Sequence, residues 1–104
     1  MTLEGIAKLA GKPVSGAMIV LVPKDSEADR ELFRRDQSDL DGSFSLPNVI
    51  PGTYTACAIE DGWDLDWSTL GVITPYCERG SQKIVIEKKE GTVRLDAPVE
   101  VHPK

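Results

Sequence analysis

The sequence predicts an all-β fold, a seven-stranded antiparallel β-sandwich with one short helix after the fifth strand. Two observations carry this prediction. Short runs of alternating apolar and polar residues recur along the 104 residues, and nine Gly and seven Pro residues separate those runs. Turn-forming residues at this spacing are typical of short strands joined by tight connections. A small closed barrel is the alternative arrangement of the same strands.

Seven segments carry the patterning of strands. In the first, Leu3, Gly5, Ala7 and Leu9 share one face and alternate with a second face. The apolar run at 18–22 predicts a strand that is at least partly covered on both faces. In chain order, the predicted strands cover residues 3–9, 18–22, 33–38, 43–46, 54–59, 81–87 and 92–96.

Two of these strands show which side chains enter the core. Phe44 and Leu46 alternate with serines, so both are predicted to point inward. Tyr54, Ala56 and Ala58 lie on one face of the fifth strand. The opposite face carries Thr55, Cys57 and Ile59.

The connections follow from the turn-forming residues. Gly42 supplies the turn 39–42 with a residue that is free to take a positive φ. An irregular loop at 61–67 precedes an apolar stripe at three-and-four spacing, which predicts a helix of at most two turns capped by Ser68. Residues 97–104 are predicted to form a tail.

The charge is concentrated in one stretch. The chain has 12 Lys and Arg against 17 Asp and Glu, a net charge of -5. Eight of the acids and none of the bases fall within 36–78, so the rest carries 12 bases and nine acids, a net of +3. That stretch is either a solvated acidic surface or a region that biases the choice of partner. The absence of a basic stripe and of a long apolar run predicts no nucleic-acid partner and no membrane insertion.

Cys57 and Cys77 are the two cysteines of the chain, and their spacing fits no zinc motif. They form either one disulfide, if the chain lies outside the cytoplasm, or two small buried hydrophobic residues. The first residues lack the basic start and apolar segment of a signal peptide. We therefore expect residues 1–104 to be a single domain excised from a larger protein.

Three blocks, in order within residues 11–54, resemble one family. Residues 11–17 read GKPVSGA and resemble the G-x-P-V-x-G-A opening of carboxypeptidase regulatory-like domains. Residues 38–44 read SDLDGSF and resemble the T-D-x-x-G-x-F hairpin of that family. Residues 46–54 read LPNVIPGTY and resemble its L-x-x-L-x-P-G-x-Y signature. The remainder of the chain matches in strand texture.

The resemblance implies a transthyretin-like, or prealbumin-like, Greek-key sandwich. It also implies a non-catalytic structural or interaction module, whose partners are the other domains of its parent polypeptide. The expected location is extracytoplasmic, meaning periplasmic, cell-surface or secreted. The segment 61–78 departs from the generic module, which returns directly to a strand, and individual function is expected there.

The segment 61–67 contains both tryptophans of the chain. If Trp63 and Trp67 are exposed, their rings can stack on a sugar while Asp64 and Asp66 accept hydrogen bonds from its hydroxyl groups. This alternative function is a starch-binding-like, carbohydrate-binding module with a glycan partner. In the competing interpretation, the rings fold back and close one end of the sandwich.

Strand direction predicts an acidic pole at one end of the sandwich. The turn 39–42 and the loop after the fifth strand leave the same end, which gathers the carboxylates of Asp39, Asp41, Asp61, Asp64 and Asp66. Such a cluster either binds a cation such as Ca²⁺ or is solvated. The motif lacks the further ligands of an EF-hand, so we predict no metal site and no cofactor.

Catalysis fits the sequence poorly. A nucleophile needs an adjacent base, and His102, the one histidine, lies in the predicted tail. The two cysteines have no partner at the level of the sequence. We therefore expect no catalytic residues and no enzyme activity.

Overall fold

Strands are the regular elements that the structure describes. The structure is a computed structural model, and it describes residues 1–24, 32–60, 77, 82–87 and 89–102. Within these ranges there are nine strands and no helix, which confirms the all-β prediction. The strands are β1 (Thr2–Leu9), β2 (Lys12–Pro13), β3 (Met18–Pro23), β4 (Arg34–Gln37), β5 (Ser43–Leu46), β6 (Gly52–Ile59), β7 (Gln82–Ile86), β8 (Thr92–Arg94) and β9 (Val99–His102).

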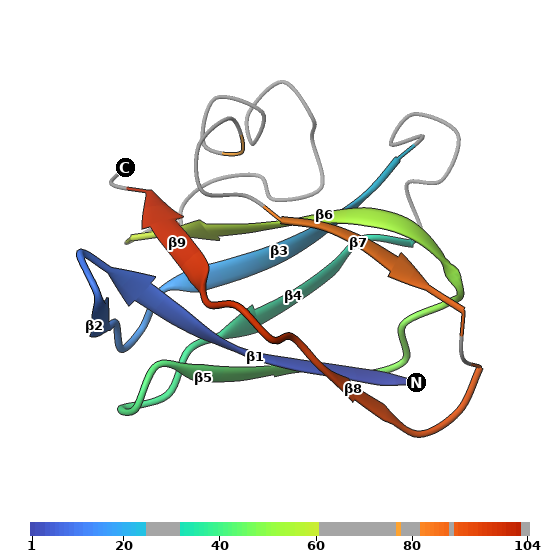
Figure 1. Ribbon diagram of the computed structural model, residues 1–104, viewed down its shortest axis with the longest axis horizontal. Helices are drawn as coiled ribbons and strands as arrows, with labels where there is room; N and C mark the ends of the chain where they lie inside the picture. The colour runs from blue at the N-terminus through green and yellow to red at the C-terminus, as the bar shows by residue number, and fades with distance from the viewer. Residues whose placement is uncertain (25–31, 61–76, 78–81, 88, 103–104) are drawn as a thin grey trace.

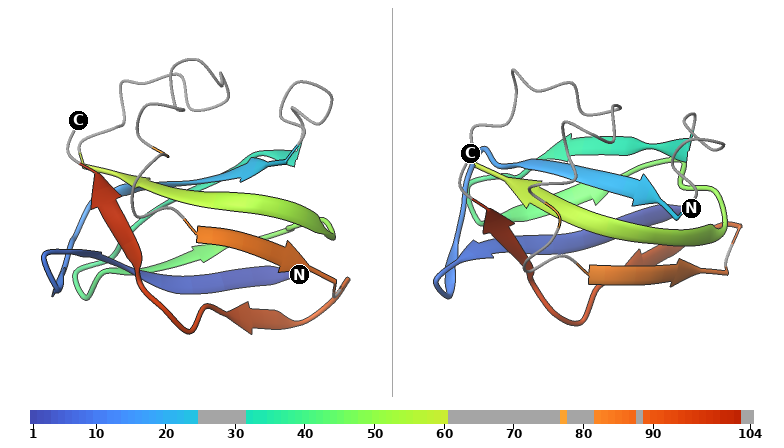
Figure 2. Two further views of the ribbon diagram at one scale, coloured as in Figure 1. Left: turned by 45° about the horizontal axis from the view of Figure 1, so that its top comes forward. Right: turned by 90° about the horizontal axis from the view of Figure 1, so that it is seen from above.

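The strands form one mixed sheet that curls until its two halves face each other (Figures 1 and 2). In one half, β1 lies between β5 and β8. In the other half, the order is β7-β6-β3-β4. β9 joins the halves at one side, because Val99 pairs with Ala7 of β1 and Val101 pairs with Ala58 of β6.

Three pairings are parallel, so the sheet differs from the antiparallel arrangement that the sequence predicts. β8 and β9 both run parallel to β1, and β9 also runs parallel to β6. β9 occupies residues that are predicted to be a tail. Its buried Val99 and Val101 flank the exposed Glu100, which is the alternation of a half-buried strand.

The sequence also predicts the number of strands and one short helix. The strands β2 and β9 are additional to the predicted seven, and β2 is a two-residue strand that follows the turn at Ala10 and Gly11. Both turn residues have a positive φ, which suits the tight reversal from β1 into β2. The predicted helix, which starts at Ser68, lies outside the described residues except for Cys77.

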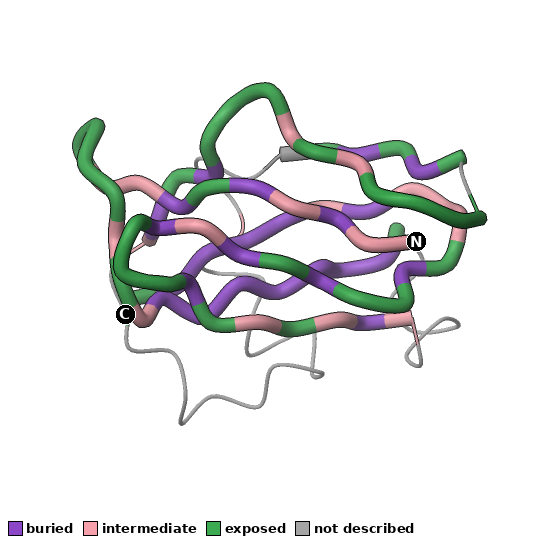
Figure 3. Tube along the Cα trace, turned by 90° about the horizontal axis from the view of Figure 1, so that it is seen from below, coloured by how far each residue is buried: buried purple, intermediate pink, exposed green. Residues whose placement is uncertain are grey.

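The main core lies between the two halves and follows the predicted strand faces. Leu3 and Ala7 of β1 are fully buried there, together with Tyr54, Ala56 and Ala58 of β6. The hydroxyl of Tyr54 donates a hydrogen bond to the carbonyl of Ile50, so the buried ring keeps its polar end satisfied. Figure 3 shows buried residues in alternation with exposed ones along the outer strands.

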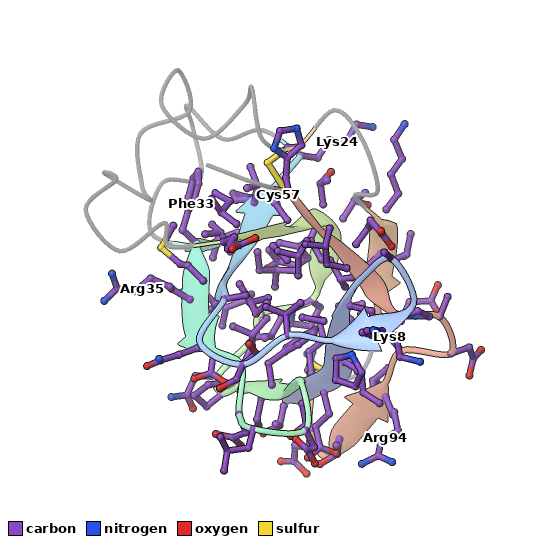
Figure 4. All side chains as sticks on the ribbon, turned by 90° about the vertical axis from the view of Figure 1, so that its left-hand side faces the viewer. Lys8, Lys24, Phe33, Arg35, Cys57 and Arg94 are labelled. Carbon is purple, nitrogen blue, oxygen red and sulfur yellow. A yellow bond between two sulfur atoms is a disulfide. The ribbon has the colours of Figure 1, made fainter. Side chains whose placement is uncertain are left out.

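A second apolar cluster covers the opposite face of β3 and β6. Its buried members are Met18, Val20, Val22, Phe33, Cys57 and Ile59. Phe33 and Cys57 lie on this side of the molecule in Figure 4. Every residue of β3 is buried, which confirms the prediction of a strand covered on both faces.

On the side of the molecule opposite β9, polar side chains hold the two halves of the sheet together. They come from β4 and from Ser38, the residue that follows β4. Arg34 donates from Nε to the carbonyl of Asn48 at 3.0 Å. Ser38, the one buried polar residue among those described, accepts from the N–H of Ala17 at 2.9 Å and donates to the carbonyl of Val14 at 2.6 Å. Buried polar groups need hydrogen-bond partners, and Ser38 has them. We call Arg34, Ser38 and these hydrogen bonds the polar seam.

Candidate functional site

A surface groove lies along the outer face of β1 and β5 and reaches β8. Its volume is about 370 Å³. The residues that line it come from both halves of the sheet: Glu4, Gly5, Ile6, Asp36, Asp39, Asp41, Ser43, Phe44, Ser45, Arg94 and Leu95. This groove brings four carboxylates together with partly exposed apolar surface, so it is the candidate site.

The groove is acidic because four carboxylates face one guanidinium. Arg94 lies 3.8 Å from a carboxylate oxygen of Glu4, and the two side chains are 78% and 38% exposed. An exposed pair of this kind contributes about 0–1 kcal/mol to stability. Arg94 therefore offsets one charge at the β8 side, and the opposite side of the groove stays negative.

Asp41 is held in its charged form by Ser43. Its Oδ1 accepts from the Ser43 hydroxyl at 2.6 Å and from the Ser43 N–H at 3.0 Å. These hydrogen bonds lower the pKa of Asp41 from its ordinary value of 3.8. The carboxylate is thus ionised at neutral pH, with one oxygen committed to the turn.

Asp36 is also committed to the fold. Its Oδ2 accepts a hydrogen bond from the backbone N–H of Ser45 at 2.8 Å. Because Asp36 lies on β4 and Ser45 on β5, this bond joins the two halves beside the groove. Asp36 and Asp41 therefore each combine a structural hydrogen bond with a contribution to the negative surface of the groove.

The hairpin turn at 39–42 forms the rim of the groove. Gly42 has φ +81°, and a Cβ there would lie 2.7 Å from the carbonyl oxygen of Ala7. The turn needs glycine both for its backbone conformation and for this close approach. Leu40 at the tip is 92% exposed, so an apolar side chain projects beside the acidic wall.

The predicted acidic pole is described in part. The end of β4, the start of β5 and the end of β6 lie at the same end of the molecule in Figure 1, as strand direction predicts for Asp39 and Asp41. The other three members, Asp61, Asp64 and Asp66, lie outside the described residues. Within the described residues, no group of three or more His, Cys, Asp or Glu side chains is placed to hold a metal ion.

The candidate ligand-binding residues of the sequence lie beyond what the structure describes. These are Trp63, Trp67, Asp64 and Asp66. The groove instead contains residues that sequence reasoning missed, chiefly Glu4, Asp36 and Arg94. The sequence offers one indication for Asp36, because it lies two residues from Arg34 and so on the same face of β4. Nothing in the local sequence links Glu4 to Arg94.

The two cysteines form a disulfide, which decides between the two alternatives left by the sequence. The Cα atoms of Cys57 and Cys77 are 5.2 Å apart, and the residues are 20 positions apart in sequence. Cys57 is buried on β6, and Cys77 packs against the second apolar cluster (Figure 4). The bond therefore fastens residue 77 to the outer face of the β6 half.

No protein-family model matches the chain, and no curated protein matches it. Among the described residues, no helix combines the length and the apolar character that a membrane crossing requires.

Proposed function

We propose that the chain is a non-catalytic structural or interaction module of a larger extracytoplasmic protein. One observation carries this proposal. β1 begins and β9 ends at opposite ends of the molecule in Figures 1 and 2, and the two strands pair in parallel through Ala7 and Val99. In a longer polypeptide, tension along the chain would load the β1–β9 hydrogen bonds together, in shear, which suits a structural role.

The fold we propose in detail is a prealbumin-like Greek key of the carboxypeptidase regulatory-like kind. The return of β6 to lie beside β3, after β4 and β5, supports the Greek-key connection. The turn at 39–42 and the buried Tyr54 after Gly52 give a physical role to two of the blocks that resemble the family.

The disulfide supports the extracytoplasmic location. Disulfides persist in oxidising compartments such as the periplasm and the cell exterior, and they are rare in the cytoplasm. Cys57 itself is buried in the second cluster, opposite Val20 of β3.

Force spectroscopy tests the structural role. The chain is placed between two marker domains and pulled from its two ends. We expect one cooperative unfolding event, because β1 and β9 resist as a sheared pair and forced unfolding depends on the rate at which that pair breaks. Stepwise unfolding, with β9 detaching first at low force, would contradict the proposal.

Carbohydrate binding is the alternative function that we propose. Its support is that described contacts bound the tryptophan segment at both ends: the N–H of Glu60 donates to the carbonyl of His102 at 2.9 Å, and Cys77 is bonded to Cys57. Anchored ends reduce the entropy lost when a loop binds a ligand. Titration of starch, cellulose and chitin fragments against tryptophan fluorescence tests it, and unchanged emission with all three would reject it.

A further inference from the structure

The outer edge of β7 carries a pattern that complements itself. Among the described strands, β7 pairs with β6 alone, and it lies along the margin of the sheet in Figure 2. Lys83, Val85 and Glu87 are exposed, whereas Ile84 and Ile86 are buried. Val85, at the centre of these three exposed residues, is 66% exposed.

Hydrogen-bond parity identifies the backbone groups that point away from β6. The carbonyl of Thr53 accepts from the N–H of Lys24 at 2.8 Å, so the polar groups of Thr53 face β3. Val85 lies opposite Thr53 in the β6–β7 register. Opposite residues of an antiparallel pair alternate between bonded and non-bonded, so the N–H and C=O of Val85 face outward. The same parity places the backbone groups of Lys83 on that edge, and Glu87 is the residue that directly follows β7.

We propose that β7 pairs antiparallel with β7 of a second copy of this chain, about a two-fold axis at Val85. In this register the two Val85 residues face each other as a hydrogen-bonded pair. Lys83 and Glu87 each lie two residues from Val85, so Lys83 of each copy faces Glu87 of the other. Lys83 and Val85 share one face of β7, and Glu87 continues their alternation one residue past the end of the strand. Each cross-strand pair is therefore either apolar or oppositely charged.

Charge complementarity favours a second copy of this chain as the partner of the β7 edge. A lysine on an edge strand ordinarily prevents pairing, because it meets no counter-charge. Here the two-fold operation supplies Glu87 opposite Lys83, twice. A two-fold interface uses the same patch on both subunits, and the β7 edge meets that requirement.

Two other edge strands lack this property. The same operation applied to β8 would place Arg94 opposite Thr92. Applied to β4 about Arg35, whose backbone groups face away from β3, it would place the two Arg35 side chains opposite each other. Arg34 and Asp36 would also face each other there, but their side chains already bond the backbone of Asn48 and Ser45. The β7 edge avoids the like-charge pair that β4 would form.

The proposed dimer is weak and sensitive to salt. One pair of strands buries less surface than a stable interface requires, so the chain should dissociate on dilution. The Lys83–Glu87 pairs are exposed to solvent, and added salt should weaken them. This inference does not depend on the proposed function of the module.

Sedimentation velocity over about 1 µM to 1 mM protein tests the pairing. We expect the wild-type sedimentation coefficient to rise with concentration. Lys83→Glu and Glu87→Lys should each abolish the rise, because each places like charges opposite each other. The double variant K83E/E87K should restore the rise, since it exchanges the charges and keeps them opposite. An equimolar mixture of the two single variants should also form dimers.

Lys12→Glu is the matched control, because it makes the same charge change at an exposed residue of β2. It should leave the concentration dependence unchanged. Thermal unfolding checks that each variant folds, and no described side-chain interaction is lost at Lys83 or at Glu87. A wild type that stays monomeric, a double variant that stays monomeric, or an equal loss in K12E would each overturn the proposal.

Discussion

The carboxylate of Asp36 on β4 accepts a hydrogen bond from the backbone N–H of Ser45 on β5, with 2.8 Å between Oδ2 and the nitrogen. β5 pairs with β1 on its other side, so this N–H belongs to the outer edge of β5. Backbone groups on such an edge can recruit another strand. Asp36 therefore occupies an edge donor and, in the same contact, joins the two halves of the sheet.

We expect Asp36→Ala to lower the free energy of unfolding by about 1 kcal/mol, because one hydrogen bond between the halves is lost. Urea unfolding at neutral pH measures the change. Asp39→Ala is the control, since it removes the same charge from the same groove and no described hydrogen bond of its side chain. If both variants unfold at the wild-type urea concentration, the contact contributes nothing to stability.

Much of the fold is predictable because strand periodicity is local. The inward faces of β1 and β6, the double burial of β3 and the turn at Gly42 all follow from residues that are neighbours in sequence. β9 was missed because a short strand near the end of the chain gains its stability from two partners. Those partners are Ala7 and Ala58, which lie far from Val99 and Val101 in sequence.

The polar seam and the groove could not be predicted either, because they also depend on residues that are far apart in sequence. Ser38 reaches Val14 and Ala17, and these contacts depend on the register between β3 and β4. Glu4 and Arg94 meet because β8 crosses to the other half of the sheet and pairs with β1. Sequence patterns indicate which face a side chain takes and carry no information on such cross-sheet neighbours.

Gly5 lies directly beneath the ring of Phe44. A Cβ at Gly5 would lie 2.6 Å from Cζ of that ring and 3.3 Å from the side chain of Leu95. Because Phe44 is buried, the ring has little room to move. We expect Gly5→Ala to lower the free energy of unfolding by about 1–3 kcal/mol through overpacking.

The matched control for Gly5→Ala is Gly52→Ala. A Cβ at Gly52 would meet the ring of Tyr54 at 3.5 Å, which is an ordinary contact. Its effect on the urea midpoint should be smaller than that of Gly5→Ala. Gly5→Ala should cost less in a chain that already carries Phe44→Leu than in the wild type, because the smaller side chain relieves the overlap. Equal effects of the two glycine substitutions would contradict the packing argument.

Asp41 makes a pH-dependent contribution to stability. Its hydrogen bonds from Ser43 lower the pKa of the folded state below the ordinary value of 3.8. The contribution is therefore fully present above the unfolded-state pKa and is lost as the pH falls through the lower, folded-state pKa. We expect the Asp41 carboxyl to titrate below 3.8 by NMR, and Ser43→Ala to move its midpoint upward. An Asp41 midpoint unchanged by that substitution would refute the assignment.

The disulfide should contribute strongly to stability. Cys57 and Cys77 are 20 residues apart, and closing a loop of that length restricts the unfolded chain by about 3 kcal/mol in the chain-entropy account. We expect reductant to lower the urea midpoint of the wild type by a corresponding amount. The bond also holds residue 77 against the cluster that includes Met18 and Ile59, so reduction should increase hydrogen exchange on β3 and β6.

The control for the reduction experiment is a chain with both cysteines replaced, Cys57→Ala and Cys77→Ala. Its urea midpoint should lie near that of the reduced wild type and should not respond to reductant. Because Cys57 is fully buried, the alanine also leaves a small cavity, so a slightly lower midpoint than that of the reduced chain is expected. A wild type whose midpoint is the same with and without reductant would show that the cross-link does not stabilise this fold.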